Sequence, residues 1–210
     1  IVATLNITGS YNLDRLIKNH KRYHLMVGGS RSGKTFATLQ WIVLYCFQHT
    51  GKTITICKKT FPSLRMGAYE GKGGFIDLLK NHLNIYDESR HNKSNNSYQL
   101  NGNTIQFIAV DQSDKLRGVA HDIVLMDEIN DFDKPDFDQI AMRTTDMIIM
   151  TQNPSNADHF SLVYKDHPDS TYTHSTYKDN PFLEQGLINQ IESYKDTDAD
   201  WWAIYGLGIP

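Results

Sequence analysis

The sequence predicts an α/β fold in which a mostly parallel sheet carries helices on both faces. Short apolar or β-branched segments alternate with segments of helical length over roughly the first 150 residues. Strands that are separated by helices favour parallel pairing in a sheet that is covered on both sides. The chain has 210 residues, 40% of them hydrophobic and 21% charged, which is enough for one full core. We therefore expect a single domain over residues 1–210, with a less regular helical part from about 158 to 210.

The first elements form a βαβ unit. Residues 23–27 are a short apolar strand, 34–47 have helical length and composition, and 53–57 are a β-branched strand preceded by a turn. A helix is then expected over 75–83.

The later elements continue the alternation. Strands 98–100 and 104–110 flank Asn101-Gly102-Asn103, and Asn-Gly is a favoured hairpin turn. Further apolar strands and helices are predicted in chain order: strand 123–126, helix 135–142, strand 147–150, helix 182–194 and a helix near 200–205.

Charge and cysteine content argue against a polybasic protein that binds nucleic acid by bulk charge, and against a disulfide framework or a zinc site formed by the cysteines. With 21 basic and 24 acidic residues the formal charge is -3, so any nucleic-acid contact has to be local. Cys46 and Cys57 lie in or at the end of apolar runs and are interpreted as buried thiols of a reducing compartment. We find neither an apolar stretch of membrane-spanning length nor a signal-peptide pattern, which predicts a cytoplasmic protein without a membrane partner.

The strongest motif is Gly28-x-x-x-x-Gly33-Lys34-Thr35, placed between a strand and a helix. In such a phosphate-binding loop, backbone N–H groups and the helix dipole favour a phosphate chain. Lys34 is expected to reach the β and γ phosphates, and Thr35 to place its hydroxyl on Mg²⁺. The motif predicts a P-loop NTPase fold, RecA/ASCE-like, with ATP and Mg²⁺ bound. The nucleotide-binding candidates are Gly28, Gly29, Ser30, Arg31, Ser32, Gly33, Lys34 and Thr35.

A second glycine-rich segment, Gly67-Ala68-Tyr69-Glu70-Gly71-Lys72-Gly73, superficially resembles another phosphate loop. It has one residue too few between its glycines and no Ser or Thr after the lysine. We interpret it as a flexible loop.

Two acids follow the uniformly apolar strand 123–126. Asp127 is the expected Mg²⁺ ligand, because open α/β sheets bind ligands at the carboxyl ends of their strands. Glu128 is the expected base that orients or deprotonates the attacking water. A GTPase is disfavoured, since the only Asn-Lys, at Asn92-Lys93, lacks the aspartate of a guanine-reading motif.

Two arginines are candidates for stabilising the transferring phosphoryl group, alongside Lys34. Arg31 lies inside the phosphate loop and can act only within its own subunit. Arg117 precedes Glu128 by eleven residues in the sequence and is predicted to act on a neighbouring subunit, although an ordinary salt bridge is the alternative.

Taken together, the motifs resemble the large terminase subunit of tailed bacteriophages. The matching segments are "GGSRSGKT", "KLRGVAHDIVLMDEIND", "TQNP", "DNPFLEQGLINQIESY" and "DWWAIYGLGIP". The resemblance implies ATP hydrolysis that drives double-stranded DNA into a procapsid. It gives Thr151, Gln152 and Asn153 a coupling role that senses the γ phosphate. Full-length members of that family carry a C-terminal nuclease domain, which we expect to be absent here, so no nuclease activity is expected from this fragment.

The resemblance implies partners as well. These are double-stranded DNA, a small terminase subunit, a portal ring and further copies of the chain in a ring, all in the host cytoplasm and not in the mature virion. Lys58, Lys59, Arg65 and Lys72 are candidate DNA contacts, with a solvated surface as the alternative for each. Tyr11 or Tyr23 is suggested for the adenine. The competing hypothesis is a helicase-like ATPase or a nucleotide-dependent switch or binding module.

Overall fold

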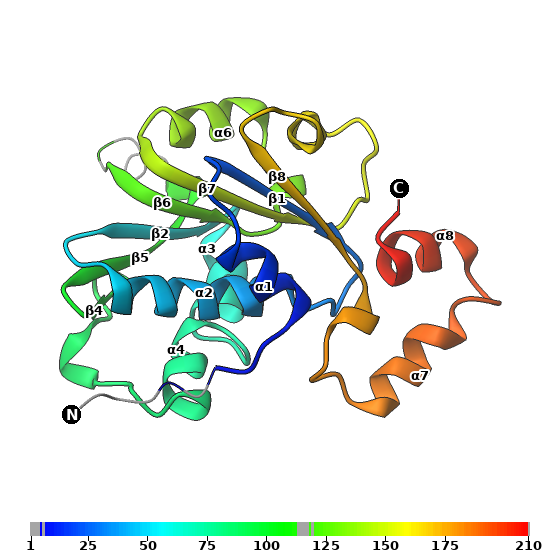
Figure 1. Ribbon diagram of the computed structural model, residues 1–210, viewed down its shortest axis with the longest axis horizontal. Coiled ribbons are helices and arrows are strands. Elements are labelled where there is room, and N and C mark those ends of the chain that lie inside the picture. Colours follow the sequence, from blue (N-terminus) through cyan, green and yellow to red (C-terminus); the bar gives the residue numbers. More distant parts are fainter. Residues whose placement is uncertain (1–4, 6, 113–117, 119, 210) are drawn as a thin grey trace.

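An eight-stranded sheet forms the centre of the molecule (Figure 1). The computed structural model describes residues 5, 7–112, 118 and 120–209. The strand order is β3-β4-β5-β2-β6-β7-β1-β8. The strands are β1 Tyr23–Gly28, β2 Thr53–Lys58, β3 His91–Asn92, β4 Ser97–Leu100, β5 Asn103–Ala109, β6 His121–Met126, β7 Thr144–Gln152 and β8 Ser170–Ser175.

The sheet is mostly parallel, as predicted. All neighbouring pairs from β5 through β2, β6, β7 and β1 to β8 are parallel, whereas β3-β4 and β4-β5 are antiparallel. Because the six parallel strands share one direction, the ends of β1, β2, β6 and β7 meet at one edge. In open α/β sheets this carboxyl edge is where ligands bind.

Helices cover both faces of the sheet, also as predicted (Figure 1). One face packs against α1 (Tyr11–Ile17), α2 (Lys34–Gln48), α3 (Phe61–Leu64) and α4 (Phe75–Asp77), and the other against α6 (Lys134–Ala141). Two apolar cores result: one joins α2 and α4 to the sheet, and the other joins Phe137 and Ile140 of α6 to it. The last helices, α7 (Gln185–Ser193) and α8 (Ala199–Trp201), lie at the β8 side of the molecule.

Most predicted elements are present, with bounds shifted by a few residues. The Asn101-Gly102 hairpin turn has φ angles of 49° and 76°, the positive values that this turn requires. The helix predicted over 75–83 is one α-helical turn followed by a π-helical turn, Leu78–His82. The predicted helix 200–205 likewise begins as α8 and continues as a π-helix over Trp202–Leu207.

The sequence reading missed several elements. Helices α1 and α3 and the two-residue strand β3 had no prediction, and β8 lies inside the part that we expected to be irregular and helical. Strand β8 reads Ser-Thr-Tyr-Thr-His-Ser and lacks the apolar run of a central strand, because it pairs with β1 alone at the edge of the sheet. Its polar side chains bond inward instead: Thr173 Oγ1 lies 2.8 Å from His24 Nε2.

The two cysteines are buried and unpaired, as expected. Burial raises the pKa of both thiols above its ordinary value. Within the described part of the chain, no helix is long and apolar enough to cross a membrane.

Candidate nucleotide site

The predicted phosphate loop connects β1 to α2 and has the backbone shape of an anion-binding nest. Gly33 has φ 81° and caps α2, and Arg31, two residues earlier, has φ 62°. Left-handed residues within such a turn direct successive N–H groups toward one concave side, which is suited to phosphate. Glycine adopts this conformation without strain, whereas Arg31 carries a cost.

The loop is held in place by residues distant in sequence. The side-chain amide Nδ2 of Asn12, on α1, donates to the Ser32 carbonyl at 2.8 Å, and Nδ2 of Asn180 donates to the Arg31 carbonyl at 2.8 Å. Both bonds engage carbonyl oxygens of the loop. Main-chain bonds add to this, from Gly29 N to Ser175 O at 3.1 Å and from Ser30 N to Tyr205 O at 2.7 Å.

Lys34 lies at the head of α2 and is 8% exposed. Its ammonium group donates to the carbonyls of Gly28 and Gly29, each at 2.9 Å, to Ser32 Oγ at 3.0 Å and to Asn153 Oδ1 at 3.3 Å. Burial lowers the pKa of Lys34 to about 8, although Asp127 and Glu128 act in the opposite direction.

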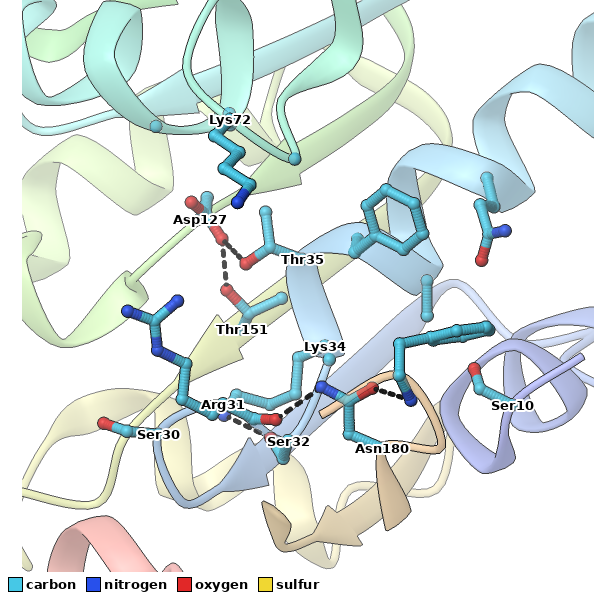
Figure 2. A pocket seen from close by; sticks show the side chains of 18 of the residues that line it. Ser10, Ser30, Arg31, Ser32, Lys34, Thr35, Lys72, Asp127, Thr151 and Asn180 are labelled. Atoms are coloured by element: carbon cyan, nitrogen blue, oxygen red, sulfur yellow. Dashed lines mark hydrogen bonds between the residues drawn. The ribbon is translucent and has the colours of Figure 1, made fainter. Parts of the chain in front are cut away.

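Asp127 follows β6 and is only 2% exposed. Its Oδ1 accepts hydrogen bonds from Thr35 Oγ1 at 2.6 Å and from Thr151 Oγ1 at 2.8 Å (Figure 2). The Asp127 carboxylate and the Thr35 hydroxyl are therefore in direct contact across the loop and the sheet edge. Carboxylate and hydroxyl oxygens are the ligands that Mg²⁺ uses beside substrate phosphates, so this pair fits the metal.

Glu128 has a left-handed backbone, with φ 59° and ψ 57°. Its main-chain N–H donates to Thr151 Oγ1 at 3.1 Å. Its Oε2 lies 2.6 Å from the Lys58 ammonium, and its side chain is 47% exposed. The backbone turn thus directs the carboxylate into the cavity, toward the end of β2.

Lys58 is not on the surface where a DNA contact would be. It is 7% exposed and pairs with Asp127 at 3.3 Å as well as with Glu128. Burial opposes its charge, but the two carboxylates outweigh that effect and raise its pKa. The sequence reading missed this location because a lysine after a strand usually faces solvent, and only the carboxylates of the neighbouring strand β6 favour its burial.

The residues predicted for coupling end β7 and line the same cavity. Thr151 joins Asp127 to the Glu128 backbone, and Asn153 accepts from Lys34. Gln152 is buried, and its Oε1 accepts a hydrogen bond from Ser161, in the segment that leads to β8.

These side chains surround one cavity of about 1150 Å³. Figure 2 shows Arg31 and Ser32 on one side of it, with Lys72 reaching toward Asp127 from the other. From the predicted set, the cavity is lined by Ser30, Arg31, Ser32, Gly33, Lys34, Thr35, Lys58, Lys72, Asp127, Glu128, Thr151, Gln152 and Asn153. Its aromatic side is formed by Phe36 and Phe182, which sequence reasoning did not identify.

Some predicted residues lie elsewhere. Lys59 pairs with Asp133 at 3.1 Å and Asp136 at 2.6 Å, and Arg65 is exposed and pairs with Glu70 at 2.6 Å. Tyr23, suggested for the adenine, begins β1 at the opposite end from the loop. Tyr11 is exposed beside a separate shallow pocket. Arg117 lies outside the described residues.

Fold and site together define the class of protein as an α/β protein with a mostly parallel sheet and a P-loop at the carboxyl edge of that sheet. The family model for the phage terminase large subunit matches residues 20–209. This chain therefore belongs to the phage terminase large subunit family. Among curated proteins, none matches the chain.

Solved structures of phage terminases share the fold. The large terminase of a thermophilic bacteriophage superposes with a TM-score of 0.75 at 16% identity, covering 97% of this chain and 54% of the phage protein. This chain thus spans about half the length of that relative. The same phage protein has also been solved in complex with ADP and with ATP-γ-S.

Two isolated domains align over nearly their whole length. The large terminase ATPase domain of Thermus phage P74-26 has a TM-score of 0.69 at 12% identity, covering 96% of this chain and 94% of that one. The N-terminal domain of the bacteriophage phi29 DNA packaging ATPase has a TM-score of 0.57 at 12% identity, covering 82% of this chain and 98% of that one.

Proposed function

We propose that residues 1–210 form one ATPase domain of a DNA-packaging motor, which hydrolyses ATP with Mg²⁺ to move double-stranded DNA into a viral procapsid. The observation that carries this proposal is the contact between Thr35 Oγ1 and Asp127 Oδ1 at 2.6 Å, directly beside a phosphate-binding nest. Membership of the terminase family supports it, as do the relatives named for ATPase activity and DNA packaging.

The loop residues and Lys34 bind the phosphates in this proposal. The inward N–H groups of residues 31–35 and the Lys34 ammonium hold the β and γ phosphates, where Lys34 exchanges its carbonyl partners for phosphate oxygens. Thr35 and Asp127 hold Mg²⁺, which neutralises charge on the phosphates when it is bound.

Glu128 is the proposed base for the attacking water. Its Oε2 lies 2.6 Å from the Lys58 ammonium, so this oxygen is occupied by the ion pair. Hydrolysis therefore requires that Glu128 turn from Lys58 toward the water. The backbone bond from Glu128 N to Thr151 links this movement to the end of β7, which supports a coupling role for Thr151, Gln152 and Asn153.

Arg31 is the proposed cis-acting arginine. Among the described residues its guanidinium has no hydrogen-bond partner, and it borders the cavity (Figure 2). Arg117 remains the proposed trans-acting arginine, in a ring of identical chains. Portal and small terminase subunits as further partners, DNA contacts at Lys59 and Arg65, and a location in the host cytoplasm belong to the same proposal.

The test combines turnover with nucleotide binding. Lys34→Ala is expected to abolish hydrolysis and weaken nucleotide binding, because it removes the ammonium that the loop directs at the phosphates. Glu128→Gln is expected to keep ATP-γ-S affinity while turnover falls by about 10² to 10⁴. Wild-type turnover in Lys34→Ala would contradict the proposal, and equal loss of binding and turnover in Glu128→Gln would make that residue structural.

Linear duplex DNA supplies the second arm of the test. A packaging motor should hydrolyse ATP faster when the assembled protein is given linear duplex. Turnover that ignores duplex DNA, measured under conditions where the chains assemble, would favour the nucleotide-dependent switch instead.

A further inference from the structure

The segment around Lys72 is a closely packed turn. Three of the four residues 71–74 are glycines. A Cβ on Gly71 would lie 1.8 Å from the Met66 carbonyl oxygen, and one on Gly74 would lie 2.4 Å from the Gly67 carbonyl oxygen. Gly73 has φ 79°, which side chains rarely tolerate. The glycines therefore let the turn pack tightly against the π-helix Arg65–Tyr69. Residues 67–69 of the segment that we interpreted as a flexible loop are thus helical.

Both ends of the turn are fastened. Before it, Arg65 Nε pairs with Glu70 Oε2 at 2.6 Å. After it, Gly73 N donates to Asp77 Oδ2 at 2.8 Å, and Gly74 N donates to the Gly71 carbonyl at 2.8 Å. Lys72 is thus presented from a backbone whose position is set on both sides.

This turn lies over the start of α2. A Cβ on Gly73 would come within 3.9 Å of the Phe36 ring, and Phe36 follows Thr35 directly. A Cβ on Gly67 would lie 3.5 Å from the Lys58 ammonium. The segment that carries Lys72 therefore spans the mouth of the cavity from the Lys58–Glu128 pair to the head of the helix.

Among the described residues, Lys72 differs from the other cavity lysines in having no hydrogen bond or ion pair, although its charge acts through space on the Asp77 carboxyl group. Lys34 and Lys58 bond to carbonyls and carboxylates, whereas among the described residues the ammonium of Lys72 has neither a hydrogen bond nor an ion pair. Figure 2 shows it extending toward Asp127 from the side opposite Arg31 and Ser32. An ammonium that faces a phosphate-binding nest without a hydrogen bond or ion pair among the described residues is a donor suited to phosphate oxygens.

We propose that Lys72 binds the γ phosphate of the nucleotide from the wall opposite the P-loop. The inference rests on the proposed function. In hydrolysis the water oxygen bonds to the γ phosphorus, the bond to the β–γ bridging oxygen breaks with its electrons staying on ADP, and Glu128 takes the water proton. Lys72 stays protonated throughout and stabilises the negative charge on the transferring group.

The position of Lys72 predicts which nucleotides it distinguishes. ADP has no γ phosphate, so Lys72 has no contact with it, whereas Lys34 reaches the β phosphate of both nucleotides. Lys72 thus reports the presence of the γ phosphate to the segment 61–74, whose outer surface carries the exposed Arg65 and Met66.

The experiment compares the affinities of ATP-γ-S and ADP by calorimetry in Lys72→Ala, Lys72→Arg and the control Lys80→Ala. Lys80 is an exposed lysine of the next segment and lies over the Tyr86 ring, outside the cavity lining. Lys72→Ala should weaken the affinity for ATP-γ-S by about 10- to 100-fold and leave the affinity for ADP within about twofold of wild type. Lys72→Arg should recover much of the ATP-γ-S affinity, and Lys80→Ala should match wild type.

Single-turnover hydrolysis gives an independent readout. The rate in Lys72→Ala should fall by about 10²-fold at saturating ATP, while the thermal unfolding temperature stays unchanged.

Three outcomes overturn the inference. Equal weakening of ATP-γ-S and ADP would make Lys72 part of the general fold of the pocket. Lys72 would instead be a DNA contact if Lys72→Ala left the ratio of the ATP-γ-S and ADP affinities unchanged but bound duplex DNA more weakly, with the salt dependence of DNA binding reduced by about one charge. Failure of the wild-type protein to bind either nucleotide would overturn the proposed function itself, and this inference with it.

Discussion

The P-loop is bordered by two walls of different construction. The sheet wall consists of Lys58, Asp127, Glu128 and Thr151, and it is joined by side-chain hydrogen bonds and ion pairs. The C-terminal wall consists of Ser175, Asn180, Tyr205 and Gly206, and it meets the loop through carbonyl oxygens and one amide.

This difference decides what each wall is sensitive to. A wall made by side-chain atoms is disrupted when one functional group is removed, even if the shape is kept. A wall made by backbone contacts tolerates many side-chain changes but not added volume, because the packed main chains have nowhere to move. The side chains with proposed roles in the reaction therefore lie on the sheet wall, whereas the shape of the loop depends on the C-terminal wall.

Gly29→Ala should have the largest effect. Its Cβ would lie 2.4 Å from the Tyr205 carbonyl oxygen and 2.6 Å from that of Gly206, so the C-terminal wall has to separate from the loop. We expect a loss of about 3 kcal/mol in the free energy of unfolding, measured by urea denaturation, and weaker nucleotide binding.

Gly186→Ala is the matched control for Gly29→Ala. It lies in α7 with nothing within 4 Å of the new Cβ, and should be neutral or stabilising by about 0.5–1 kcal/mol. Wild-type stability in Gly29→Ala would mean that the C-terminal wall does not pack on the loop.

Thr151→Val tests the sheet wall with shape preserved. It leaves the Glu128 N–H without a partner and removes one donor from Asp127, which should cost about 1–3 kcal/mol in stability and reduce turnover more than nucleotide affinity. Thr173→Val removes a similar buried bond, to His24, away from the cavity. If both variants lose turnover equally, the effect of Thr151 is stability alone.

The smallest expected effect is a pH dependence of nucleotide binding. The pKa of Lys34 is lowered to about 8, below its ordinary value of 10.5, so above pH 8 the nucleotide-free protein loses a charge that the phosphates require. The affinity for nucleotide should therefore be constant below pH 8 and fall by up to about tenfold per pH unit above it.

Calorimetry at pH 9 in buffers of different ionisation enthalpy should detect uptake of about one proton on nucleotide binding. Because Asp127 and Glu128 raise the pKa of Lys34, Glu128→Gln should shift the onset of the decline to lower pH. Affinity that stays constant to pH 10 would contradict a neutral Lys34 in the free protein.

Except for Lys58, the sheet wall could be predicted from the sequence, because Asp127, Glu128 and Thr151 directly follow apolar strands. Thr35 contacts Asp127 as the strand and helix pattern predicts, and Lys34 lines the same cavity. The parallel sheet was likewise predictable, since central strands such as 123–126 are apolar throughout.

The C-terminal wall could not be predicted in this way. Its contacts come from the main chain of Ser175 and Tyr205, and any residue type has a carbonyl. The amides of Asn12 and Asn180 contact the loop across long sequence separations, without a recognisable spacing. Lys58 and Lys72 were assigned to DNA by their charge alone, while their positions depend on which strand and turn face the cavity.

The two left-handed non-glycine residues at the cavity have a consequence for protein engineering. Arg31 at φ 62° and Glu128 at φ 59° each hold a conformation that costs about 1 kcal/mol relative to glycine. A selection for heat resistance alone would therefore enrich glycine at both positions. Each such change removes a charged group that the proposed reaction needs, so a more thermostable motor domain obtained this way would also be a slower one.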